Sequence, residues 1–183
     1  LSSAASDVYK RQIWEKGVML RFFQVNRDIF LRTLCLVAVT LFFTSAGASQ
    51  GEIILAVNTL LMQLFTLFSY VMDGFAYAGE ALSGRYIGAR NREAFTDTVR
   101  HLFGWGAVMA VLFTLVYALG GNAFLGLLTD DKEVIAVADT YFYWALAVPA
   151  VGIAAFIWDG IFIGATATRG MLLSMAAAAV SFF

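Results

Sequence analysis

The 28 residues from Leu102 to Thr129, LFGWGAVMAVLFTLVYALGGNAFLGLLT, contain no charged side chain. A helix of roughly 20 apolar residues is long enough to cross the hydrocarbon core of a bilayer. A helix on the surface of a water-soluble protein would instead carry a strong polar face that recurs with the 3.6-residue turn. This stretch lacks such a face, so it predicts a membrane-spanning helix.

Similar uncharged runs occur on both sides of this stretch. They cover residues 33–51, 53–72 and 140–158, with lengths of 19, 20 and 19 residues. The whole chain is 61% hydrophobic and only 14% charged, whereas soluble domains carry about 25% charged residues. We therefore predict an all-α integral membrane protein, a polytopic helical bundle. The expected spans are about 33–51, 53–73, 102–128 and 140–166, followed by an incomplete span at 170–183.

The basic residues lie almost entirely on one side of the predicted membrane. If the spans alternate in direction, one side holds 11 Lys and Arg residues, and the other holds only Lys132. Cytoplasmic loops carry such an excess of basic residues. We therefore expect a multi-pass protein of the cell inner (plasma) membrane, with its N-terminal segment and the connection 73–100 in the cytoplasm.

The two ends of the chain differ from the predicted spans. Residues 1–12 are polar, and we expect a disordered or artefactual tail there. Residues 13–31 mix apolar and basic side chains and predict a cytoplasmic amphipathic connection. This connection is either a helix on the inner membrane surface, which we favour, or an extension of the first span. The chain starts at Leu1 and stops at Phe183 within an apolar run, so we expect a fragment.

Enzymatic chemistry finds little support in the sequence. The chain has one histidine, His101, and one cysteine, Cys35, and no cluster with metal-ligand spacing. It also lacks a nucleophile–base pair and a glycine-rich phosphate loop. We predict that the protein is not an enzyme, uses no metal or cofactor, and binds the lipid bilayer rather than nucleic acid.

Polar side chains inside the apolar runs are the candidates for function. Asn58 and Gln63 lie within the second run. An unpaired amide in hydrocarbon is costly, so we expect both to face the bundle interior, bonded to another helix or lining a water-filled path. Asp73-Gly74 and Asp159-Gly160 each stand near the predicted inner end of an inward-running helix. Their carboxylates are either proton or cation carriers or gate partners, or interfacial anchors of the inner helix ends.

Four more residues are candidates for gating or structural roles. Glu80 lies seven residues beyond Asp73, and a basic residue follows each Asp-Gly pair, namely Arg85 and Arg169. Pro149 is the only proline, and we expect it to kink the fourth span because it lacks a backbone donor. Gly120 and Gly121 are expected to end or bend the third helix.

Three segments resemble one transporter family. Residues 73–89, DGFAYAGEALSGRYIGA, resemble the DGFA-x-A-x-E-A-L-x-G-x-x-x-G segment of the multidrug and toxic compound extrusion (MATE) transporters. Residues 158–169, WDGIFIGATATR, look like the second signature of the DinF-like branch. Residues 25–33, VNRDIFLRT, resemble the approach to that branch's seventh helix.

The resemblance implies a fold of two six-helix lobes with a substrate cavity between them. This chain would be a truncated C-terminal lobe, supplying helices seven to ten and part of the eleventh, and its partner would be the missing N-terminal lobe. The family exports cationic or amphipathic small molecules in exchange for protons or sodium, by alternating access. Its best-known coupling carboxylate in this branch belongs to the first helix, which has no counterpart here. Alternatives are a lipid-linked oligosaccharide flippase of the same superfamily, or an inactive membrane fragment or scaffold.

Overall fold

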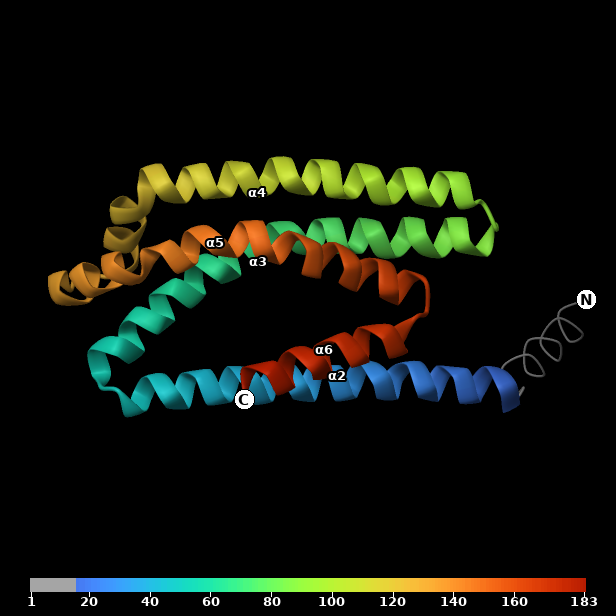
Figure 1. Cartoon of the computed structure of the whole chain (residues 1–183), viewed down its shortest axis with the longest axis horizontal. Coiled ribbons are helices and arrows are strands. Elements are labelled where there is room, and N and C mark those ends of the chain that lie inside the picture. Colours follow the sequence, from blue (N-terminus) through green and yellow to red (C-terminus); the bar gives the residue numbers. More distant parts are fainter. Residues whose placement is uncertain (1–15) are drawn as a thin grey trace, which may run out of the picture. The chain divides into compact units, whose positions relative to one another are not determined.

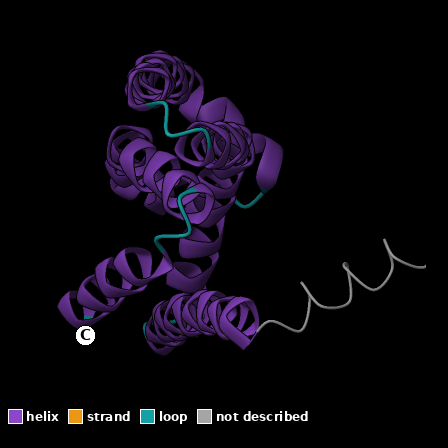
Figure 2. Ribbon diagram, turned by 90° about the vertical axis from the view of Figure 1, so that its right-hand side faces the viewer, coloured by secondary structure: helices purple, strands orange, loops and turns teal. Residues whose placement is uncertain are grey.

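A computed structural model describes residues 16–183, and these residues form five helices joined by short loops (Figures 1 and 2). The expected all-α architecture is confirmed for the described chain. The tail at 1–12 and the start of the amphipathic stretch lie outside the described residues. The helices are α2 (Lys16–Ser49), α3 (Glu52–Gly88), α4 (Arg92–Leu128), α5 (Lys132–Gly164) and α6 (Thr168–Phe182).

The chain divides into two compact units, which are described separately. The first unit comprises Leu1–Val39 and Ala167–Phe183, and the second comprises Thr40–Thr166. The first therefore holds most of α2 together with α6. The second holds the end of α2 and all of α3, α4 and α5.

Four helices are long and apolar enough to cross a membrane, which is the number that the sequence predicts. These segments are Phe22–Ser49, Glu52–Gly88, Arg92–Gly121 and Lys132–Gly164. Helix α6 is apolar but shorter.

The helices extend well past the predicted span limits. The sequence placed a connection at 73–100, but α3 continues to Gly88 and α4 begins at Arg92. Charged residues limit a span in lipid but do not break a helix, and residues 73–88 contain no proline. The loop is instead fixed by Asn91, whose side chain accepts a bond from the Ala94 amide at 3.1 Å and so caps α4.

Helix α2 is unbroken from Lys16 to Ser49. The described part of the amphipathic stretch is thus continuous with the helix of the first span, which is the alternative we did not favour. The reason is local, because no glycine or proline occurs between Gly17 and Gly47 to interrupt the helix.

Two of the long helices bend. Figure 1 shows that α5 changes direction near its middle, and Pro149, which is buried, lies at about the middle of this helix. Helix α4 turns near its carboxyl end (Figure 1), in the part that includes Gly120 and Gly121. Proline and paired small residues are the usual causes of such bends.

The second unit is held together by a close contact between α3 and α5. A Cβ atom on Gly160 would overlap the carbonyl group of Ala76, and one on Gly164 would overlap that of Glu80. Each pair is separated by 84 positions (160 less 76, and 164 less 80), so the two helices run parallel in a fixed register. Glycines spaced four apart allow helix backbones in membranes to approach in this way.

Helix α4 packs on one side of the α3–α5 pair. Gly106 of α4 lies against Ile153 and Ile157 of α5. The Tyr117 hydroxyl donates a hydrogen bond of 2.7 Å to the Leu64 carbonyl of α3. Two buried clusters fill the space between the three helices. One contains Val57, Leu60, Leu64, Tyr117, Leu125, Val134, Ala138, Phe142 and Ala145, and the other contains Phe68, Met72, Leu102, Ile157 and Ile161.

The contact predicts different effects for two glycine substitutions. Gly160→Ala should destabilise the full-length protein by about 2 kcal/mol, because the added methyl group must push α3 away. Gly74→Ala is the matched control, since nothing lies within 4 Å of a Cβ atom there. Alanine should stabilise that position by up to about 1 kcal/mol. Thermal unfolding in detergent measures both, and equal midpoints would contradict the close contact.

Candidate functional site

Helix α3 carries a line of polar and aromatic side chains on the side away from the core. Its members recur every three or four residues and so share one helix face. Tyr70 and Tyr77 are 72% and 69% exposed, and a Cβ atom on Gly74 between them would meet open space. We call this set the polar face of α3. It comprises Thr59, Gln63, Thr66, Tyr70, Asp73 and Tyr77, of which Thr66 and Asp73 are half-buried and the others exposed.

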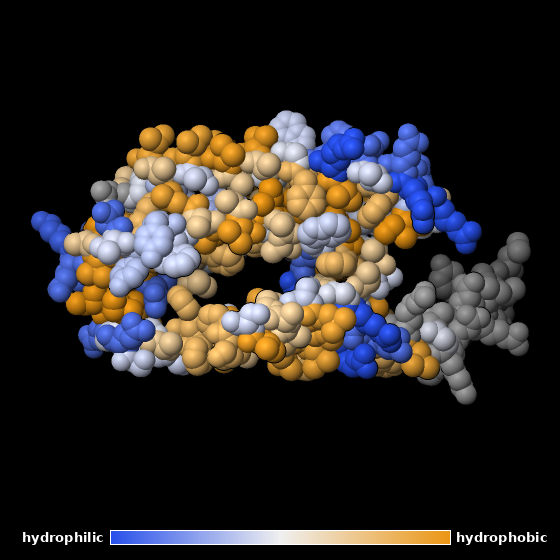
Figure 3. Space-filling view, viewed as in Figure 1, coloured by the Kyte–Doolittle hydropathy of each residue, from blue (hydrophilic) through white to orange (hydrophobic). Residues whose placement is uncertain are grey.

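The exposed side of α4 has a different character. Its large exposed residues are all apolar, and Figure 3 shows hydrophobic colour along α4, with hydrophilic colour at the end joined to α3. Lipid is a suitable neighbour for such a surface. It is a poor one for Gln63, because an unpaired amide in hydrocarbon costs several kcal/mol. The exposed apolar residues of α4 are Trp105, Val108, Val111, Leu112, Leu115, Val116, Leu119, Leu127 and Leu128.

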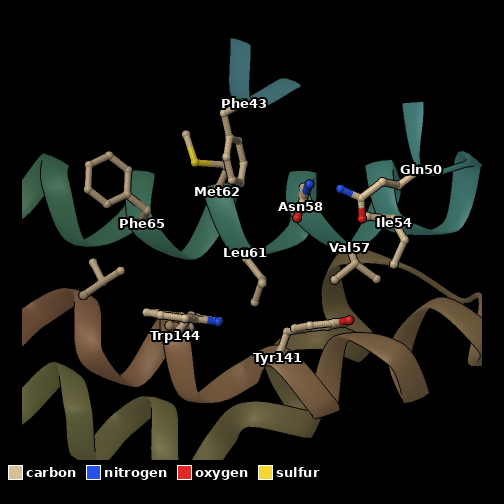
Figure 4. Close-up of a pocket in the computed structure, with 12 residues that line it drawn as sticks. Phe43, Gln50, Ile54, Val57, Asn58, Leu61, Met62, Phe65, Tyr141 and Trp144 are labelled. Carbon is tan, nitrogen blue, oxygen red and sulfur yellow. The ribbon is translucent and has the colours of Figure 1, made fainter. Parts of the chain in front are cut away.

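A pocket of about 450 Å³ lies in the second unit, between the end of α2, the first half of α3 and the first half of α5. Figure 4 shows Val57 and Leu61 extending from α3 toward Tyr141 and Trp144 of α5, while Phe43 approaches from α2. No charged side chain lines the pocket. Aromatic walls with a few amides suit a flat apolar or cationic ligand. The lining residues are Phe43, Gln50, Ile54, Val57, Asn58, Leu61, Met62, Phe65, Tyr141, Trp144, Ala145 and Val148.

The two amides predicted from the sequence lie in different places. Asn58 is half-buried and lines the pocket. Its amide nitrogen reaches α2, where a Cβ atom on Gly47 would lie only 2.6 Å from it. Gln63 belongs to the polar face of α3 and is exposed in this chain, so it does not face the interior of the second unit. The structure therefore brings only Asn58 to the pocket.

The two Asp-Gly carboxylates lie at nearly the same level. In the register of the α3–α5 contact, Asp73 aligns with position 157, two residues or about 3 Å from Asp159. At 100° per residue, both side chains leave the α3–α5 pair on the side opposite to α4. Both are half-buried. Neither lines the pocket, so they form a separate polar region on the same pair of helices.

The place of Asp73 within its helix differs from the sequence prediction. The sequence placed this residue near a helix end, but α3 continues for another 15 residues to Gly88. Asp159 is close to a helix end, five residues before Gly164. A helix that continues beyond the membrane edge explains the difference, because hydropathy marks the bilayer and not the end of the helix.

The remaining candidates are spread along the two units. Glu80 is half-buried, and its carbonyl group forms part of the contact with Gly164. Arg85 is exposed, with its guanidinium 5.9 Å from the centre of the Tyr86 ring. Pro149 is buried in α5. Arg169 is exposed in the first turn of α6 and belongs to the first unit.

Several aromatic residues of these sites were not singled out from the sequence. Tyr70 and Tyr77 stand seven residues apart, and Gln63 precedes Tyr70 by seven. This spacing places polar groups on one helix face and could have been recognised. Tyr141 and Trp144 gave no comparable signal, because aromatic residues are common wherever a span meets the membrane surface.

Comparison with known proteins agrees with the family that the motifs resemble. The MatE family model matches residues 29–182. The chain is 41% identical over 167 residues to DNA damage-inducible protein F of Escherichia coli (strain K12), covering 91% of this chain and 36% of that protein. It is 26% identical over 133 residues to the Protein DETOXIFICATION 45, chloroplastic, of Arabidopsis thaliana, covering 73% of this chain and 24% of that protein.

A third relative is the Protein DETOXIFICATION 42 of Arabidopsis thaliana, 22% identical over 150 residues, which are 80% of this chain and 29% of the relative. No solved structure matches the chain significantly. The chain thus spans about a third or less of the length of these relatives. The family match covers most of the sequence and agrees with the apolar helices and both Asp-Gly motifs. The chain therefore belongs to the MatE family, whose members are transporters and not enzymes.

Proposed function

We propose that this chain is part of a secondary active transporter that exports cationic or amphipathic small molecules. The observation that carries the proposal is the contrast between the two exposed faces. The apolar face of α4 suits lipid, whereas the polar face of α3 suits a water-filled path shared with the missing N-terminal lobe. In this proposal, the substrate moves along α3 as the two lobes alternate their access to the two sides of the membrane.

The charge of the candidate sites favours cations over anions. Among the described residues of the second unit, Asp73, Glu80 and Asp159 lie within spanning helices, whereas the arginines gather at the end of α3 and the start of α4. The aromatic pocket adds side chains that attract cations through their π faces. A flippase for an anionic, lipid-linked sugar would need basic groups at this depth. Export of cations is therefore the better-supported function.

Asp159 and Asp73 are the proposed coupling residues, with protons or sodium as the driving ion. A carboxylate within a membrane helix is a functional candidate because its burial is costly unless it binds a proton or a cation. Glu80, Arg85 and Arg169 are proposed gate or anchor residues, and Pro149 is proposed to provide the bend in α5. The proposal also places the protein in the inner membrane, with the N-terminal segment of this chain in the cytoplasm, as the distribution of basic residues favours.

Transport by the full-length protein tests the proposal. Cells or proteoliposomes that contain it should accumulate or retain less of a fluorescent cation such as ethidium. The effect should disappear when the proton and sodium gradients are collapsed. If no gradient-dependent efflux occurs across a broad panel of cationic and amphipathic compounds, the proposed function is wrong.

The coupling role predicts an order of effects among carboxylate variants. At equal expression, Asp159→Asn should lower the transport rate by about a hundredfold, a loss typical of removing a positioned proton-transfer group. Asp73→Asn should lower it less. Asp139→Asn is the control, because this carboxylate is exposed in the second turn of α5. Unchanged kinetics in the Asp159 variant would mean that its carboxylate only anchors the helix.

A further inference from the structure

Asp28 is a buried carboxylate that the proposed transport path does not use. It lies in α2, in the first unit, and is only 1% exposed. The surrounding stretch, Val25–Thr33, is one of the motifs that resembles the family. Its sequence, with basic residues on both sides, predicts a charged surface rather than a buried acid. Burying a charge is costly unless it is paired and hydrogen-bonded, so its partners indicate what it does.

Both carboxylate oxygens of Asp28 have a partner. Arg27 donates from Nη2 to Oδ1 at 3.0 Å and from Nε at 3.3 Å. The Thr168 hydroxyl donates to Oδ2 at 3.1 Å, and it comes from 140 positions further along the chain. Thr168 is 3% exposed, whereas the Arg27 side chain is 60% exposed. The bond to Thr168 is therefore the buried one and the one that joins two helices.

Helix α6 begins at Thr168 without a cap of its own. The preceding residue, Ala167, has no side chain that could accept from the first amides, and no side-chain cap bond is formed there. The first four amides of a helix lack partners within the helix, and its amino-terminal end carries a partial positive charge. A carboxylate from α2, held at this end, supplies the negative charge that a capping Asp or Ser would otherwise provide.

We propose that Asp28 is a positioning residue that holds the first turn of α6 against α2. The carboxylate replaces the missing cap, and Thr168 locks it to the start of the helix. The NRD motif at residues 26–28 and the end of the second signature at Thr168 are then two halves of one contact. Since the proposed transporter must move its helices between two states, this contact, which rests on the proposed function for its role in transport, makes α2 and α6 move together at this point.

Hydrogen–deuterium exchange of the full-length protein tests the contact without requiring transport. The amides of residues 172–175 bond to carbonyls of the first turn of α6, so loosening of that turn should expose them. Asp28→Ala should speed their exchange by about tenfold, as expected for the loss of a hydrogen bond to a charged group. Asp28→Asn should have a smaller effect, because an amide oxygen still accepts from Thr168.

Variants of Thr168 separate the hydroxyl group from packing. Thr168→Val keeps the shape but removes the donor, so it should speed exchange as Asp28→Ala does, whereas Thr168→Ser should resemble the wild type. The double variant Asp28→Ala/Thr168→Val should exchange no faster than the single variants, because both remove the same bond. Arg27→Gln should have little effect, since exposed ion pairs contribute little.

Asp131→Ala is the matched control for a capping carboxylate. Asp131 accepts from the amides of Glu133 and Val134 at the start of α5, so its loss should change exchange in α5 and not in α6. Unchanged exchange at residues 172–175 in both Asp28→Ala and Thr168→Val would overturn the proposal. Equal exchange in Thr168→Ser and Thr168→Val would also overturn it. If Asp28→Ala fails to fold, the Thr168 pair decides.

The role in transport has its own readout. In a preparation that exports a cation, Thr168→Val should lower the maximal rate and leave the KM unchanged, because the contact does not touch the substrate. Thr168→Ser should restore the rate. A changed KM with an unchanged maximal rate would contradict a positioning role. Failure of the full-length protein to transport any cation would count against the proposed function but not against the exchange result.

Discussion

The close contact of α3 with α5 is the constraint on which the second unit depends. Gly160 and Gly164 have no side chain to hold the helices apart, so their backbones meet Ala76 and Glu80 directly. In lipid, helices gain little from burying apolar surface, and close backbone packing supplies much of the attraction. Once this register is fixed, the side chains on each face of both helices are placed. Every candidate site in the second unit follows from it.

The contact also determines which groups remain on the outside of the pair. Helix α4 covers one side of α3 and α5 through Gly106 and Tyr117. The uncovered side presents Asp73 and Asp159 at nearly the same level, and the polar face of α3 runs beside them. The Asp-Gly motifs thus combine two tasks in adjacent residues. In the second motif, Gly160 makes the contact while Asp159 supplies the charge; in the first, Gly74 leaves open space next to Asp73.

The sequence was sufficient for the fold class because hydropathy reports directly on the solvent of a helix. It predicted four long helices, but not that α3 continues fifteen residues past Asp73, because charge ends a span and not a helix. Asn58 could be predicted as a pocket residue in kind, since amides avoid lipid. The burial of Asp28 could not be predicted, because its partner Thr168 lies 140 positions away and only the folded chain brings them together.

Accessibility of the two exposed faces to water tests the central claim most directly. In a full-length protein with Cys35 replaced by alanine, single cysteines at Gln63 and Tyr70 of α3 should react with a membrane-impermeant thiol reagent. Cysteines at Val108 and Leu115 of α4, also within the apolar runs, should not react. Pre-incubation with a transported cation should slow labelling at Gln63 and Tyr70. Equal reactivity on both helices, or labelling confined to α4, would contradict a water-filled path along α3.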